Sequence, residues 1–206
     1  MTLTLTRLLC AAAGCGALLL AGCASEKPVT NTTFDFGPAT MTAAAPATPA
    51  IGAVVVTDVT GLAALDNERM FYRLNYADPL QARSYAHARW SATPLQMVTQ
   101  RLKTRIAQTG IKVLTPTDAS DGVAILRTEV DDFTHSFDSQ SQSYGQLVLR
   151  VSLFQGHKLI DQRTFSRKDP ARSADAAGGA RALAGATDAV AADIVSWLAS
   201  LPAHKQ

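Results

Sequence analysis

Four residues near the N-terminus, Leu20-Ala21-Gly22-Cys23, have the types and the order that direct covalent attachment of lipid to a thiol. They close an uncharged run of 15 residues, Leu8 to Gly22, that follows Arg7. A positive charge, a short apolar run and small residues are typical of an export signal, whereas a membrane-spanning helix needs about 20 apolar residues. The cysteine directly after them predicts a bacterial lipoprotein signal over residues 1–22, with Cys23 as the lipid-bearing first residue of the mature chain. The alternative is an ordinary secretory signal with a chance cysteine.

Cysteine chemistry in the mature chain is expected to be confined to Cys23. The other two cysteines, Cys10 and Cys15, lie within the predicted signal and would leave with it. Acylation of the Cys23 sulfur would leave no free thiol, so we expect neither a disulfide nor a cysteine-based metal site in the mature protein.

No other group of residues forms a recognisable catalytic pattern. The four histidines share no metal-ligand spacing and are interpreted as surface residues, most clearly His157 in a turn and His204 in the tail. A metal site assembled by folding is the alternative for this set, which consists of His87, His135, His157 and His204. Asp131 and Asp132 are adjacent in a predicted strand, where neighbouring side chains point to opposite faces. We therefore expect no enzyme activity, no metal and no cofactor.

Aromatic side chains are concentrated in one short segment. Residues 71–90 contain several of them, in a chain of which only 6% of the residues are aromatic. Such a group can line a groove for a peptide or an acyl chain, or can form a docking face. The alternative is that these side chains belong to the core and to strand pairs. The candidates for the docking face or groove are Tyr72, Tyr76, Tyr85 and Trp90.

Length and charge limit the class of protein. The chain has 206 residues, so 184 remain after loss of residues 1–22, which is enough for one domain with a sizeable core. It carries 19 basic and 17 acidic residues, and loss of Arg7 with the signal leaves 18 basic ones and a charge near +1. A near-neutral chain without blocks of like charge is not expected to bind nucleic acid.

Hydrophobic periodicity predicts the elements that position these residues. A helix is predicted from an N-cap at Thr93 to Gly110, because Pro94 and Gln96 complete a capping pattern and apolar residues follow at spacings of three and four. A second, alanine-rich helix is predicted over residues 174–198. Alternating or continuous apolar runs predict strands at residues 34–38, 51–59, 69–76, 111–114, 123–133, 146–154 and 159–165. Residues 82–90 are expected to form either another short strand or an extended approach to the first helix.

The order of these elements predicts an α+β fold. We expect a single domain over residues 34–201, with a mainly antiparallel or mixed sheet and helices packed on one face. Residues 23–33 are polar and are expected to form a lipidated tether, and residues 202–206 a tail. No apolar run after the signal is long enough for a bilayer span, so we expect a tethered domain rather than a membrane-spanning one.

In the order of its motifs the chain resembles the ABC-type transport auxiliary lipoproteins of Gram-negative bacteria, relatives of the lipoprotein in the paraquat-inducible (Pqi) lipid-transport system. The resemblance covers nearly the whole mature chain, and the order of its short motifs is more specific than any one of them. The residues that carry it are Leu20–Cys23, Phe34–Pro38, Tyr72–Pro79, Tyr85–Pro94, Glu129–Asp138 and the final helix ending near Trp197.

The resemblance implies a non-enzymatic accessory lipoprotein in the outer membrane, facing the periplasm. It implies an MCE-domain protein and an ABC transporter as partners in moving phospholipid between the two membranes. The family offers no catalytic residues, so only lipid attachment transfers to a residue of this chain, Cys23. Ala24 follows it in place of the aspartate associated with inner-membrane retention, which favours outer-membrane sorting.

Two other functions are compatible with the sequence. The domain could itself hold a phospholipid as a periplasmic carrier, or it could regulate envelope assembly, for instance through a peptidoglycan synthase. Bound lipid would distinguish the first of these, and binding to a synthase the second.

Overall fold

The computed structural model describes residues 30–40, 51–118 and 121–201. The predicted signal, Cys23, most of the predicted tether and the tail at 202–206 lie outside these residues. Along the described chain the elements are β1 (Thr32–Phe34), β2 (Ala53–Val56), β3 (Thr60–Gly61), η1 (Ala63–Leu65), β4 (Arg69–Leu74), β5 (Ala82–Trp90), α2 (Pro94–Ala107), β6 (Lys112–Leu114), β7 (Ala124–Phe137), β8 (Ser143–Gln155), β9 (Lys158–Pro170) and α3 (Ala176–Ser200).

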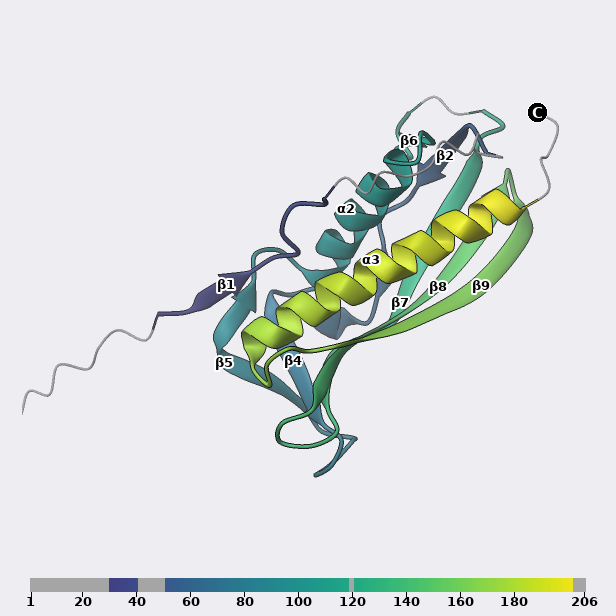
Figure 1. Ribbon diagram of the computed structural model, residues 1–206. Helices are drawn as coiled ribbons and strands as arrows, with labels where there is room; N and C mark the ends of the chain where they lie inside the picture. Colours follow the sequence, from purple (N-terminus) through teal and green to yellow (C-terminus); the bar gives the residue numbers. More distant parts are fainter. Residues whose placement is uncertain (1–29, 41–50, 119–120, 202–206) are drawn as a thin grey trace, which may run out of the picture. The chain divides into compact units, whose positions relative to one another are not determined.

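The strands form one mixed sheet whose organising strand is β7 (Figure 1). Along one edge β7 pairs in parallel with three short strands in succession, β2, β3 and β4. Along the other edge it pairs with β8 in antiparallel order, and β8 pairs in the same way with β9. β5 lies antiparallel to β4, while β1 and β6 add parallel pairs to β5 and β2.

Two long hairpins are formed by β7, β8 and β9. Their inward side chains alternate with outward ones, as Leu147, Leu149, Val151 and Leu153 show by being nearly inaccessible to solvent. The β8–β9 turn contains Gly156 at φ 58°, a left-handed conformation that suits glycine. Both central strands are longer than the predicted strands at 123–133 and 146–154, because β7 continues to Phe137 and β8 begins at Ser143.

The two helices pack against each other, and α3 lies across β7, β8 and β9 (Figure 1). The predicted capping box of α2 is present: the Thr93 hydroxyl accepts from the Gln96 backbone amide, and the Gln96 side chain accepts from the Thr93 amide. The N-cap of α3 is Asp175, which accepts from the Gly178 amide at 2.7 Å. The predicted apolar face of α3 is buried against the sheet, as shown by Leu183, Val190, Ile194 and Trp197.

One helix, α3, is long and apolar enough to cross a membrane by length and composition, contrary to our expectation from the sequence. Half of its most apolar 18-residue window is buried inside the domain, and its packing against the sheet accounts for its apolar character. We therefore interpret α3 as the core helix of the domain.

The predicted fold class, a single α+β domain with a mixed sheet and helices on one face, is confirmed. The main error concerns the first strand, which was predicted at residues 34–38 and is found at Thr32–Phe34. The reason is that Phe36 leaves the sheet and packs its ring against Trp90 and Phe133, with centroids at 5.8 Å and 6.1 Å. Alternation of aromatic residues indicated a strand, but tertiary packing directs Phe36 into the core.

Candidate docking surface

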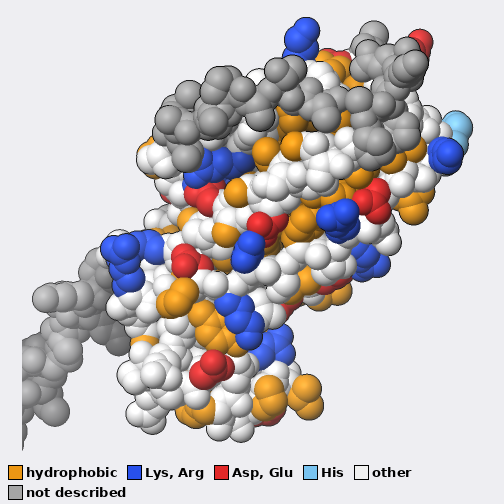
Figure 2. Space-filling model, turned by 45° about the vertical axis from the view of Figure 1, so that its right-hand side comes forward, with side chains coloured by type: hydrophobic (Ala, Val, Ile, Leu, Met, Phe, Trp, Pro, Cys, Tyr) orange, Lys and Arg blue, Asp and Glu red, His pale blue; other side chains and the backbone are white. Residues whose placement is uncertain are grey.

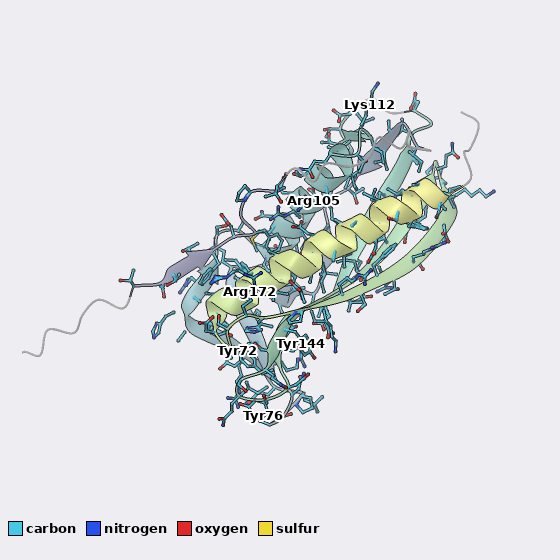
Figure 3. The ribbon with its side chains drawn as sticks, in the orientation of Figure 1. Tyr72, Tyr76, Arg105, Lys112, Tyr144 and Arg172 are labelled. Atoms are coloured by element: carbon cyan, nitrogen blue, oxygen red, sulfur yellow. The ribbon has the colours of Figure 1, made fainter. Side chains whose placement is uncertain are left out.

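The structure brings two of the four candidate aromatic residues together, Tyr72 and Tyr85. Figure 3 shows the position of Tyr72. Tyr72 on β4 and Tyr85 on β5 have ring centroids 4.6 Å apart, and both side chains are partly buried. Phe137 of β7 approaches the Tyr72 ring at 5.9 Å, and His135 lies 4.4 Å from Phe137. We call Tyr72, Tyr85, His135 and Phe137 the aromatic cluster.

His135 is completely buried in this cluster, so its interpretation as a surface residue is wrong. The neighbouring small residue explains the burial: a Cβ on Gly179 of α3 would stand 2.2 Å from His135 Nδ1, so glycine lets the helix close over the ring. Burial lowers the pKa of His135 to about 4, so the imidazole is neutral at neutral pH. Its Nδ1 lies 2.8 Å from the Tyr85 hydroxyl, and burial raises the pKa of Tyr85 above its usual range.

Tyr76 lies apart from the cluster, in the turn between β4 and β5 (Figure 3). We call this turn, Asn75–Gln81, the tip hairpin. Tyr76 is 46% exposed there and Leu80 is 89% exposed. The turn is attached to the β7–β8 hairpin through Asn75, whose amide nitrogen donates to Asp138 at 3.0 Å and to the Tyr144 hydroxyl at 3.2 Å.

The fourth candidate, Trp90, is part of the hydrophobic core. It is only 1% exposed, and its ring packs against Phe36 and Phe133. A partner therefore has no access to it in the folded domain. Of the four aromatic residues, Tyr72, Tyr76 and Tyr85 present surface to solvent, while Trp90 is buried in the core.

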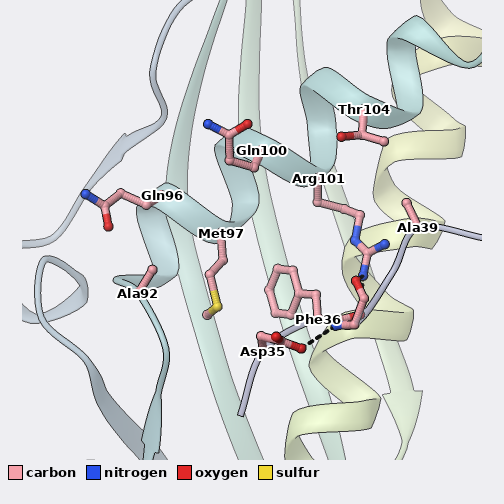
Figure 4. A pocket seen from close by; sticks show the side chains of 10 residues that line it. Asp35, Phe36, Ala39, Ala92, Gln96, Met97, Gln100, Arg101 and Thr104 are labelled. Atoms are coloured by element: carbon pink, nitrogen blue, oxygen red, sulfur yellow. Dashed lines mark hydrogen bonds between the residues drawn. The ribbon is translucent and has the colours of Figure 1, made fainter. Parts of the chain in front are cut away.

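A shallow groove of about 410 Å³ lies elsewhere, between α2 and the segment that follows β1 (Figure 4). Phe36 and Met97 form its apolar part, with Ala39 and Ala92 beside them. Arg101, 5% exposed, donates to the carbonyls of Phe36 and Gly37 and so holds that segment in place. This groove was not predictable from a local pattern, because its residues come from segments that are distant in sequence. The paired aromatics Phe34 and Phe36, next to a glycine and a proline, were the available signal.

A charged cluster fixes the two helices beside this groove. Asp188 of α3 accepts two hydrogen bonds from Arg105 of α2, at 2.8 Å and 2.6 Å, and lies 3.4 Å from Arg101. The hydrogen bond with Asp188 raises the pKa of Arg105. Arg105 also donates to the carbonyl of Thr40 at 2.8 Å. The segment after β1 is therefore held by two arginines of one helix.

The described residues offer little that resembles a catalytic centre. Within residues 30–40, 51–118 and 121–201, no three His, Cys, Asp or Glu side chains lie close enough together to hold a metal ion. Asp131 and Asp132 have different partners: Asp131 accepts from Arg150 at 2.7 Å, and Asp132 from Thr134 and Gln146. A bulge in the β7–β8 pairing occurs at this point, between Val130 and Asp132. The lipid-attachment candidate Cys23 lies outside the described residues.

Comparison with known proteins supports a single family. The family described as "ABC-type transport auxiliary lipoprotein component" matches residues 34–195. No curated protein matches the chain. Among solved structures, protein XCC0632 from Xanthomonas campestris is similar with a TM-score of 0.70 at 22% identity, over 82% of this chain and 94% of that one. A second structure, of an uncharacterized protein, is similar with a TM-score of 0.65 at 16% identity, over 82% of this chain and 99% of that one.

At these identities the two structures establish the fold alone. The family match is broader evidence, because it covers most of the chain and spans β1 to α3. It begins at Phe34, next to the arginine-held segment after β1, and ends inside the helix whose apolar face closes the core. The chain therefore belongs to the ABC-type transport auxiliary lipoprotein family.

Proposed function

We propose that this protein is a non-enzymatic accessory lipoprotein of an ABC/MCE-type system that moves phospholipid between membranes, and that it docks the periplasmic end of that complex at the outer membrane. The observation that carries this proposal is the family match over residues 34–195. The lipoprotein description of the family supports an envelope location at a membrane. Cys23 with the preceding signal supplies the lipid anchor, and Ala24 favours the outer membrane.

The physical basis is a division of labour between anchor and domain. Acyl chains on Cys23 would keep the protein at the membrane, where stable residence needs more than one chain. The domain beyond residue 33 would present a rigid face at a raised effective concentration near its partner. We propose the domain boundaries predicted from the sequence: signal 1–22, tether 23–33, domain 34–201 and tail 202–206.

A free stretch of strand edge supports docking near the candidate aromatic residues. From Ala82 to His87, no strand in the described part of the chain pairs with the outer edge of β5, since β1 begins opposite Ala88. Unpaired edges accept an extra strand from a partner unless charges discourage it. This part of β5 carries one charge, Arg83, and presents Tyr85, whereas the open edge strand β9 carries Lys158, Asp161, Arg163, Arg167, Lys168 and Asp169.

Capture of the acylated protein tests the partnership. A photo-crosslinking residue in place of Ser84, exposed on the free edge, is expected to trap an MCE-domain protein or a component of the ABC transporter. The same residue in place of Ser196, exposed on α3, serves as the matched control. Absence of any MCE or ABC component from the products specific to position 84 and from detergent-solubilised complexes would reject the proposed partnership.

The groove beside α2 favours a second function, that of a lipid carrier. Its volume of about 410 Å³ and its Phe36–Met97 surface are suited to part of an acyl chain. Native mass spectrometry of gently purified protein would then show bound phospholipid. Met97→Lys should abolish this binding, because it places a cation against the acyl chain in the groove. If neither the wild type nor Met97→Lys carries phospholipid, the carrier function is rejected and docking stays the proposed function.

A further inference from the structure

The tip hairpin has the most exposed large apolar side chain among the described residues. Leu80 is 89% exposed and Tyr76 46%, whereas the other exposed large apolar residues of the described chain lie in separate elements, Leu62 beside η1 and Leu159 in β9. Figure 2 shows hydrophobic side chains at this lower end of the molecule, with Lys and Arg side chains next to them. A single exposed apolar side chain is common on folded domains, but Leu80 and Tyr76 are exposed together on one short hairpin, and such a pair indicates a contact outside the domain.

Several hydrogen-bond donors of the tip hairpin are paired within the hairpin itself, which lowers the cost of moving it away from water. The amides of Ala77 and Asp78 donate to the Leu74 carbonyl at 3.0 Å and 2.9 Å. The Leu80 amide donates to the Asp78 carboxylate at 2.9 Å. Arg73 donates to the Pro79 carbonyl at 2.6 Å. These four donors already have partners, so they lose no hydrogen bond when the turn moves from bulk water into the interfacial layer.

The direction of β1 relates this tip to the lipid anchor. β5 begins at Ala82, beside the tip, and runs away from it, and β1 runs parallel to β5 with Thr32 opposite Ala88. The chain therefore enters β1 from the side of the tip. Six strand residues separate Ala88 from Ala82, which is roughly 20 Å at about 3.3 Å per residue. Thr32 follows Cys23 by nine residues, which span at most roughly 30 Å when extended.

A lipid on Cys23 and the tip hairpin can thus reach the same membrane plane. We propose that the tip hairpin is a second membrane contact, in which Leu80 and Tyr76 enter the interfacial layer of the phospholipid leaflet that holds acylated Cys23. Tyrosine is suited to this layer because its ring is apolar and its hydroxyl remains wet. Arg73 and Arg83 lie on the strands directly behind the tip, where one donor of each side chain binds the hairpin itself, at the Pro79 carbonyl and the Gln81 side chain. Their remaining donors would bind lipid phosphates in this arrangement.

The consequence is a fixed orientation of the domain. An acyl chain alone holds the domain at the membrane but leaves it free to turn, whereas a second contact directs the groove and the far end of the sheet into the periplasm. This inference rests on acylation of Cys23 from the proposed function, but not on the identity of the transport partner.

Labelling of the acylated full chain in vesicles tests the second contact. Leu80→Cys and Tyr76→Cys each introduce a free thiol into a mature chain whose own Cys23 sulfur is blocked, and a polarity-sensitive fluorophore is attached there. The vesicles contain phosphatidylethanolamine and phosphatidylglycerol with nitroxide-labelled lipid as quencher. Leu159→Cys is the matched control, because Leu159 is 47% exposed but lies near the β8–β9 turn, at the opposite end of β8 from the tip.

Labels at residues 80 and 76 are expected to be quenched several-fold more strongly than the label at residue 159, with a blue-shifted emission. Equal, weak quenching at all three positions would overturn the proposal. A blue-shifted emission at residue 80 that appears only when an MCE or ABC protein is added would also overturn the proposal. That result would assign the tip hairpin to a protein partner. If the wild-type chain accepts the fluorophore at Cys23 and washes off the vesicles, acylation of Cys23 is contradicted. This control distinguishes failure of the acylation from failure of the second membrane contact.

Discussion

His135 shows how a single residue acquires its properties from burial. It lies under α3 in the aromatic cluster, with Nδ1 on the Tyr85 hydroxyl and, among the described residues, no hydrogen-bond partner for Nε2. The folded state therefore disfavours the imidazolium, and the pKa of His135 falls from 6.5 to about 4. In the unfolded chain the ring takes up a proton at its ordinary pKa.

The domain should therefore lose stability in acid through this residue. Because the folded pKa lies below the unfolded one, the contribution of His135 is complete above pH 6.5 and declines as the pH falls toward about 4. The total loss of stability is about 3 kcal/mol, because the pKa falls from 6.5 to about 4 and each pKa unit corresponds to 1.36 kcal/mol. Urea unfolding of the wild type and of His135→Phe at several pH values measures it. Parallel pH curves for the two proteins would show that His135 does not titrate in this way.

At the scale of elements, α3 depends on small residues that let it approach the sheet. Gly145 of β8 faces the helix backbone, and a Cβ there would stand 2.5 Å from the Leu183 nitrogen. Gly179 plays the same role from the helix side, over His135. The apolar face of α3 could be read from periodicity, but these contact points could not, because they depend on which strand the helix crosses.

Gly145→Ala should strongly destabilise the domain. Backbone cannot move aside as a flexible side chain can, so the added methyl group would cost about 3 kcal/mol or more. Gly52→Ala is the control, since a Cβ at Gly52 meets no atom within 4 Å and is expected to change the free energy of unfolding by less than about 0.5 kcal/mol. Similar unfolding midpoints for the two variants would contradict the close approach of α3 to β8.

Packing of α2 against α3 depends on the carboxylate of Asp188, which pairs with two arginines of α2. Asp188→Ala leaves Arg101, which is 5% exposed, without its carboxylate and removes both hydrogen bonds to Arg105. Loss of one partner of a buried pair costs about 3–5 kcal/mol, so with Asp188 itself partly exposed we expect a cost of about 2–3 kcal/mol. Thermal unfolding with Asp193→Ala as control measures this, because the Arg167–Asp193 pair is exposed at 51% and 30% and is worth less than about 1 kcal/mol. Equal losses of stability in Asp188→Ala and Asp193→Ala would show that burial of the arginine does not strengthen the Asp188 ion pairs.

At the scale of the whole molecule, the anchor and the folded domain are expected to be independent. Cys23 precedes β1 by nine residues in the sequence and makes up no part of the described domain. The domain is stabilised by an apolar core that extends from β2 to α3. Loss of the lipid should therefore change the location of the protein and leave its stability unchanged.

Cys23→Ala tests this independence. The variant should leave the membrane fraction and appear as a soluble periplasmic protein with the unfolding temperature of the wild type. Membrane fractionation with metabolic labelling by palmitate, followed by thermal unfolding of both proteins, provides the measurement. A variant that still incorporates palmitate would contradict lipid attachment at Cys23.

Features that depend on neighbouring residues were predictable from the sequence. The capping box at Thr93 and the apolar periodicity of α2, β8 and α3 are local, so their residues indicate them directly. The lipoprotein signal at residues 1–22 rests on the same kind of local pattern and stays a prediction. The fold class followed from the order of these elements. The family resemblance likewise followed from the order of short motifs.

Which of the candidate residues meet depends on strand pairing between distant segments. Strand β7 pairs in parallel with β2, β3 and β4, and such pairings join segments whose register no local pattern specifies. This topology places Tyr72 and Tyr85 over His135, sends Trp90 into the core and leaves Tyr76 exposed at the tip. Four aromatic residues of one segment thus receive three different environments, because burial is fixed by the strands and helices that pack around each side chain.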